Sequence, residues 1–111
     1  MKISVLTPTY NRAYLLPRLY ESLLQNKNDG IEIEWLIMDD GSNDETKNIV
    51  EKWQEQNQIS IQYNYQENRG KMISINRLVQ KATGDLIVDC DSDDYFTKDA
   101  FQIIRRSMEG K

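Results

Sequence analysis

The sequence contains no histidine and a single cysteine, Cys90. A lone cysteine cannot form a disulfide within the chain, which favours a reducing, cytosolic setting. Zinc sites in proteins are built mainly from cysteine and histidine, so any metal bound here is expected to have oxygen ligands. Oxygen ligands favour a hard cation such as Mg²⁺ or Mn²⁺.

Long apolar runs and an excess of basic residues are missing as well. No run approaches the roughly 18 apolar residues of a membrane-spanning helix, and the first residues lack the basic and apolar regions of a secretion signal. The net charge of −4 argues against a nucleic-acid partner or an anionic membrane surface. With 39% hydrophobic and 29% charged residues, the chain suits one globular domain, residues 1–111, in the cytoplasm.

The sequence does contain a regular alternation of strand-like and helix-like segments, which predicts an α/β fold with a mainly parallel, Rossmann-like open sheet and helices on both faces. The aliphatic run Leu86–Val88 is expected inside the sheet, whereas the period of two in Ile59–Tyr65 indicates a strand nearer an edge. Strands are expected at 2–6, 33–38, 59–65 and 86–88, separated and followed by helices that bear core residues at 15–24, 49–53, 72–82 and 100–108.

The last expected strand ends in a cluster of acids, Asp89, Asp91, Asp93 and Asp94. Carboxylates this close repel one another unless a cation lies among them, so the cluster indicates a divalent cation site. A solvated turn that caps the next helix is the simpler alternative for an acidic turn taken alone. An EF-hand is excluded, because Asp94 stands at its glycine position and Ala100 at its closing glutamate position.

Four chemically unusual loops are expected at one edge of the sheet, because ligands of open parallel sheets bind beyond the carboxyl ends of the strands. This agreement favours a shared ligand and metal site over four unrelated turns. The glycine-rich dinucleotide turn and the P-loop are both absent, so a diphosphate would be held mainly through a cation, helped by Lys or Arg. The loops are 7–12, 39–42, 68–71 and 89–94.

Five segments in order resemble the nucleotide-sugar-binding half of glycosyltransferase family 2, whose members have the GT-A fold. The resemblance covers nearly the whole chain, and the order of the motifs makes it specific. It implies a truncated GT-A fold, of the kind used in cell-wall or polysaccharide biosynthesis. The segments are Ile3–Arg12, Met38–Thr46, Asn68–Gly70, Ala82–Asp85 and Asp91–Asp94.

The resemblance also implies roles for individual acids. Asp91-Ser92-Asp93 is similar to the family's DXD motif, so Asp93 would be the principal metal ligand and Asp91 would contact the ribose or the metal. Asp40 would accept a hydrogen bond from the base, which in this family is usually uracil. The implied cofactor is Mn²⁺ or Mg²⁺.

The same resemblance places further residues around the nucleotide. Thr7, Pro8 and Tyr10 would line its pocket, with Tyr10 available to pack on the base. Arg12 and Lys71 would contact the base or the phosphates.

The function implied is transfer of a sugar from a UDP-sugar to a hydroxyl of a saccharide or lipid-linked acceptor, commonly with inversion. The catalytic Asp or Glu base is expected beyond Lys111, so the fragment is expected to bind donor without turnover. Apolar surface left open by the missing strands predicts a homodimer. A non-catalytic interaction module of the same fold remains the alternative. Metal-dependent phosphoryl transfer ranks low, since it needs an aspartate where the chain has Thr7-Pro8-Thr9.

Overall fold

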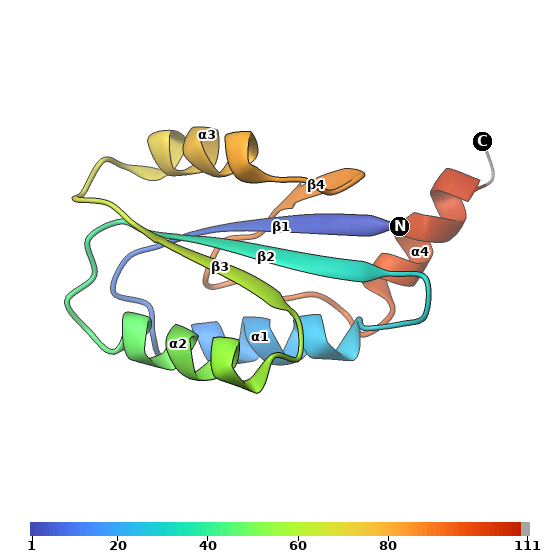
Figure 1. Cartoon of the computed structure of the whole chain (residues 1–111), viewed down its shortest axis with the longest axis horizontal. Coiled ribbons are helices and arrows are strands. Elements are labelled where there is room, and N and C mark those ends of the chain that lie inside the picture. The colour runs from blue at the N-terminus through green and yellow to red at the C-terminus, as the bar shows by residue number, and fades with distance from the viewer. Residues whose placement is uncertain (110–111) are drawn as a thin grey trace.

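A four-stranded parallel sheet forms the centre of the computed structural model, which describes residues 1–109 (Figure 1). The spatial order of the strands is β3-β2-β1-β4, and every pairing is parallel. The predicted alternation and the α/β fold class are therefore confirmed. The strands are β1 (Lys2–Thr9), β2 (Glu32–Asp39), β3 (Ser60–Tyr65) and β4 (Leu86–Asp89).

Helices cover both faces of the sheet. Helices α1 (Leu16–Gln25) and α2 (Thr46–Gln56) lie against one face, and α3 (Lys71–Lys81) lies against the other (Figure 1). Helix α4 (Ala100–Glu109) lies near the amino end of β1. Within residues 1–109, every helix is too short or too polar to span a membrane.

The two faces carry cores of unequal size. The larger core lies under α1 and α2, where Tyr20, Trp35 and Trp53 stack, with 4.3 Å between the ring centroids of Tyr20 and Trp53. The smaller core lies under α3 and is built around Leu36 and Leu78. Because β1 and β2 are covered on both faces, most of their residues are buried, and β2 is continuously apolar from Trp35 to Met38.

One expectation about the edge strands of the sheet is confirmed, and another is contradicted. Strand β3 pairs only with β2, so its predicted position near an edge is confirmed. The prediction that Leu86–Val88 lies in the sheet interior is wrong, because β4 pairs only with β1 and Ile87 is 41% exposed. A short aliphatic run does not reveal how many strands flank it.

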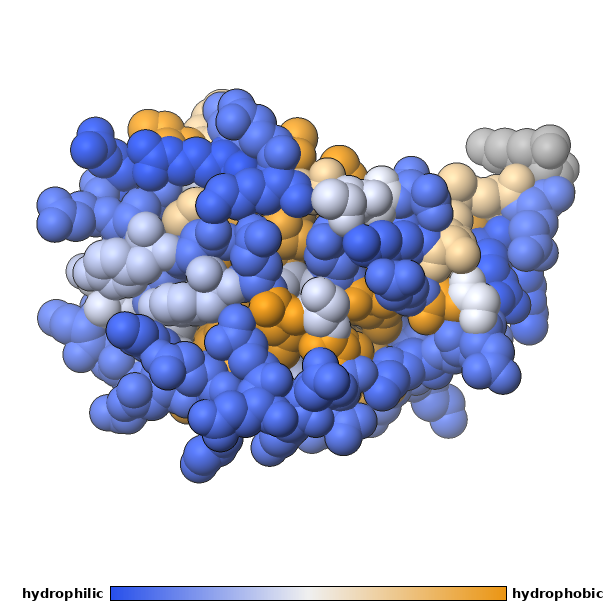
Figure 2. Space-filling model, viewed as in Figure 1, coloured by the Kyte–Doolittle hydropathy of each residue, from blue (hydrophilic) through white to orange (hydrophobic). Residues whose placement is uncertain are grey.

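The surface seen in Figure 2 is mostly hydrophilic, with hydrophobic patches over α3 and between the sheet and the helices below it. Met72 and Val79 of α3 and Ile87 of β4 are exposed apolar side chains. The expected self-association would use such a surface. It stays a prediction, which sedimentation of concentrated protein tests, and a clean monomer is the contrary result.

Candidate functional site

The carboxyl ends of the strands surround a cleft of about 360 Å³. Residues that follow all four strands line it, as the parallel topology requires. The structure thus brings together every predicted site residue except Thr7, while their binding roles remain predictions. The lining residues are Pro8, Thr9, Tyr10, Arg12, Asp40, Lys71, Ser74, Asp91, Ser92 and Asp93.

Thr7 does not line the cleft, contrary to expectation. Its side chain is fully buried, and its hydroxyl accepts a hydrogen bond of 2.9 Å from the Trp35 indole N–H. The hydroxyl therefore satisfies a polar group of the aromatic core. Thr9, two residues further on, lines the cleft instead, and its buried hydroxyl has no hydrogen-bond partner among the described residues. A buried polar atom without a partner is costly, which points to a ligand or water in the cleft.

Asp40 is held rigidly at the wall of the cleft. The backbone N–H groups of Arg69 and Gly70 donate to its carboxylate at 2.6 and 3.0 Å, and the Gln66 amide donates at 2.8 Å. Burial opposes the charge, but these donors outweigh it, so the pKa of Asp40 lies below its ordinary value. Three donors leave one of roughly four acceptor positions free, so Asp40 is a fixed acceptor for one further donor.

Gln66 is a supporting residue that sequence reasoning missed. It is buried, and its amide also donates to the Ser74 hydroxyl at 2.9 Å while its oxygen accepts from Arg77 at 2.9 Å. Gln66 thereby connects Asp40 to helix α3. The available signal was its position directly after β3, at the same edge of the sheet as Asp40.

The acidic cluster is smaller than the sequence suggests. One carboxylate oxygen each of Asp91, Asp93 and Asp94 lies within 4.8 Å of the others. The Asp94 N–H donates to the Asp91 carbonyl at 3.0 Å, and this turn gathers the three side chains. Asp89 stands outside the group, because it is still the last residue of β4, paired with Leu6. Three carboxylates at this spacing form a donor set that suits a hard divalent cation.

Basic side chains partly neutralise these acids. The Lys71 ammonium lies 2.8 and 2.9 Å from the two carboxylate oxygens of Asp91, and this hydrogen bond is the main reason that the pKa of Lys71 is raised. The Arg12 guanidinium lies 3.8 Å from the Asp93 carboxylate. Arg18 donates to the Asp93 carbonyl at 2.8 Å, which fixes the backbone of the turn without using the carboxylate.

Cys90 lies beside the acidic turn, but its thiol is unreactive. Burial, together with the negative charges of Asp94, Asp91 and Asp93, raises the pKa of its thiol to about 12. A neutral thiol is neither a good nucleophile nor a good metal ligand. Cys90 is therefore a small buried residue next to the site, as expected.

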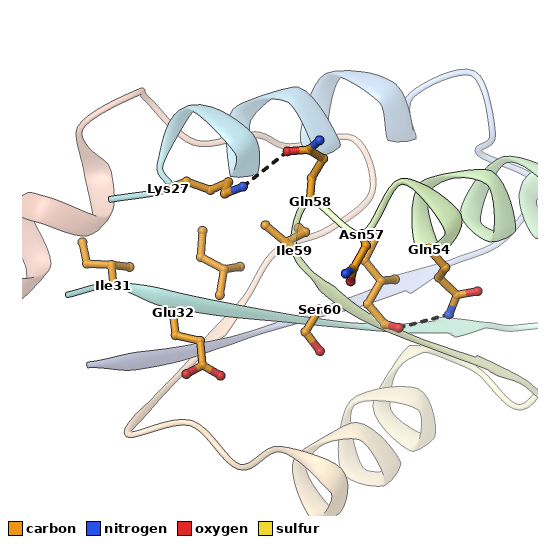
Figure 3. A pocket seen from close by; sticks show the side chains of 10 residues that line it. Lys27, Ile31, Glu32, Gln54, Asn57, Gln58, Ile59 and Ser60 are labelled. Carbon is orange, nitrogen blue, oxygen red and sulfur yellow. Dashed lines mark hydrogen bonds between the residues drawn. The ribbon is translucent and has the colours of Figure 1, made fainter. Parts of the chain in front are cut away.

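A second, larger cavity of about 550 Å³ lies at the other end of the sheet, by the amino ends of β2 and β3 (Figure 3). Isoleucines in or directly before β2 and β3 and polar side chains near the ends of α1 and α2 line it. Among residues 1–109, its ionisable lining residues are Lys27 and Glu32, and the Lys27 ammonium points to the Gln58 amide oxygen at 3.4 Å. The larger cavity therefore has fewer charged side chains in its lining than the smaller one.

Comparison with known proteins identifies the family. The family model described as glycosyl transferase family 2 matches residues 4–110. An uncharacterised glycosyltransferase of Mycoplasma genitalium is 38% identical over 109 residues, which are 96% of this chain and 37% of that protein. The chain belongs to glycosyltransferase family 2. This membership also removes the phosphoryl-transfer alternative.

Two solved structures are similar to the fold. Staphylococcus aureus TarS 1-349 in complex with UDP-GlcNAc superposes with a TM-score of 0.89 at 30% identity, over 99% of this chain and 32% of TarS 1-349. The mannosyltransferase PcManGT of Pyrobaculum calidifontis, in complex with GDP-Man and Mn²⁺, gives 0.78 at 27%, over 89% of this chain and 30% of that one. The fold is GT-A, and the chain spans at most 37% of the length of these relatives.

Proposed function

We propose that this chain is the donor-binding part of a glycosyltransferase that moves a sugar from a UDP-sugar to a hydroxyl of a saccharide or lipid-linked acceptor. The observation that carries the proposal is the cleft at the carboxyl edge, where the fixed acceptor Asp40 faces the same space as the crowded acids Asp91 and Asp93. One end of the cleft thus suits a nucleobase and the other suits a metal-bound diphosphate. The relatives TarS and PcManGT, whose solved structures are complexes with nucleotide sugars, support this assignment.

The base would be recognised at Asp40. Its remaining acceptor position would take the N–H of uracil, and the backbone donors that hold the carboxylate keep it ionised and oriented. Tyr10 is 49% exposed at the cleft and is available to pack on the base. Pro8 and the unpartnered hydroxyl of Thr9 complete this part of the wall.

Asp91 and Asp93 would hold Mn²⁺ or Mg²⁺ as a DXD motif. Their oxygen donors fit a hard cation, and the buried thiol of Cys90 offers no competing soft ligand. When bound, the cation would neutralise charge that develops on the departing diphosphate. Lys71 and Arg12 stand beside the same carboxylates, where they can contribute positive charge to the phosphates.

Activation of the acceptor hydroxyl is assigned to a residue outside residues 1–111. By family resemblance this base is an Asp or Glu, and the reaction inverts the anomeric centre. The fragment would then bind donor without turning it over, and release of free sugar from UDP-sugar at an enzymatic rate would contradict this. A cytoplasmic location belongs to the same proposal, and recovery of the protein outside the cytoplasm in cell fractionation would contradict it.

The test is titration calorimetry with UDP in the presence and absence of Mn²⁺. The unmutated protein should bind UDP more tightly with Mn²⁺, and Asp93→Asn should weaken this binding about tenfold or more, which corresponds to at least about 1.4 kcal/mol. Asp89→Asn is the matched control: it makes the same change of charge in the same segment but outside the carboxylate group, and should change the affinity by less than about threefold.

Two results would reject the proposal. Absence of binding heat with the unmutated protein would favour the non-catalytic interaction module. Equal losses in Asp93→Asn and Asp89→Asn would show that only the general negative charge of the segment matters, and that no specific ligand set exists.

A further inference from the structure

Lys71 already occupies the atoms of Asp91 that a metal ion would need. Its ammonium lies 2.8 Å from Oδ1 and 2.9 Å from Oδ2, so both oxygens of the carboxylate are engaged at once. Arg12 is a looser partner for Asp93, at 3.8 Å. An ammonium and a divalent cation cannot share these oxygens at such distances without strong repulsion. Metal binding at Asp91 therefore requires Lys71 to move.

Lys71 is well placed to move. It is the first residue of α3, so its backbone is fixed by the helix, while its side chain is 62% exposed on a flexible four-carbon stem. An exposed ion pair changes an equilibrium constant by about fivefold at most. The contact with Asp91 is thus strong enough to compete with a metal ion and weak enough to be exchanged.

The local charges indicate what draws Lys71 away. Asp91, Asp93 and Asp94 carry three negative charges, and Lys71, Arg12 and Arg18 supply three positive charges beside them. A divalent cation alone would give the group excess positive charge, whereas a diphosphate arriving with it would restore the balance and give Lys71 a new partner.

We propose that Lys71 is a resident counter-cation that blocks Asp91 until a nucleoside diphosphate draws it off, so that metal and nucleotide bind cooperatively. This rests on the proposed function. The proposal predicts that Lys71 lowers the affinity for the metal ion only while the nucleotide is absent. The coupling is reciprocal, so Mn²⁺ strengthens nucleotide binding by the same factor.

The test follows free Mn²⁺ by electron paramagnetic resonance during titration of the protein, with and without saturating UDP. Lys71→Met should bind Mn²⁺ about threefold more tightly than the unmutated protein without UDP, because the competing ammonium is gone. With saturating UDP the two affinities should converge. Lys71→Arg keeps a positive charge that can pair with both carboxylate oxygens of Asp91, so without UDP it should bind Mn²⁺ no more tightly than the unmutated protein.

Lys52→Met is the matched control, since it removes the same charge from an exposed position of α2, on the opposite face of the sheet. It should leave both affinities unchanged. No gain in Lys71→Met without UDP, or an equal gain with and without UDP, would overturn the proposal. Failure of the unmutated protein to bind UDP would reject the proposed function and the coupling, while the nucleotide-free titration would still decide whether Lys71 competes for Asp91.

Discussion

Both ends of the sheet carry carboxylates, but the surroundings of the carboxylates differ between the two ends. At the amino end, Glu34 of β2 accepts hydrogen bonds from the Ser4 hydroxyl at 2.7 Å and from the amide and hydroxyl of Thr83 at 3.0 Å each. At the carboxyl end, three acidic side chains crowd within 4.8 Å. A carboxylate satisfied by its own chain stabilises the fold, whereas crowded carboxylates retain capacity for a ligand.

At the amino end of the sheet, contacts within the chain join β4 to β1. Burial opposes the charge of Glu34, but the donors from Ser4 and Thr83 and the nearby Lys2 outweigh it and lower the pKa of this carboxyl. Gly84 fits against β1 only because it lacks a side chain, since an added Cβ would lie 2.6 Å from the Ser4 hydroxyl and 2.7 Å from the Ser4 backbone nitrogen. The polar groups at this end are therefore fixed by contacts within the chain.

The largest expected effect in this comparison is on stability, from Glu34→Ala. The substitution leaves the Ser4 and Thr83 donors without their acceptor, which should lower the free energy of unfolding by about 2 kcal/mol. Urea unfolding measures the loss, and UDP and Mn²⁺ affinities of the folded variant should not change. Glu32→Ala on the same strand is the control: its side chain is 68% exposed, and the change should be within about 0.5 kcal/mol. Equal losses in both variants would remove the distinction between the two ends.

The sequence predicted the features that depend on local pattern and topology. The alternation of elements predicted parallel strands, and parallel strands place the loops after them at one edge, so the meeting of Asp40 with Asp91 and Asp93 followed. Contacts between distant residues have no local signature. Gln66 and Asp40 are 26 positions apart and Glu34 and Thr83 are 49 apart, and neither contact was predicted.

The errors have the same origin. The buried hydroxyl of Thr7 accepts a hydrogen bond from Trp35, which lies 28 positions away, and no pattern near Thr7 indicates that contact. Leu86–Val88 was expected in the interior of the sheet. This prediction failed because a run of aliphatic residues indicates hydrophobicity and not the number of neighbouring strands. The family motifs predicted which loops meet at the cleft, whereas the contacts of the individual side chains within it depend on the tertiary structure.

The smallest expected effect is a gain in stability at the other end of the sheet, from Asp93→Asn. In metal-free buffer, loss of one charge relieves repulsion from Asp91 and Asp94 but also removes attraction to Arg12, so the net gain should be about 0.5 kcal/mol or less. The Arg18 bond to the Asp93 carbonyl is unaffected by this change.

Mn²⁺ should then reverse the order of the two proteins in urea unfolding. A ligand that binds only the folded state stabilises it, so the unmutated protein should gain stability with added Mn²⁺ while Asp93→Asn should gain little. A loss of more than about 1 kcal/mol in metal-free Asp93→Asn would mean that Asp93 supports the fold as Glu34 does. The crowded acids would then be structural, and the contrast between the two ends of the sheet would no longer identify which of them binds a ligand.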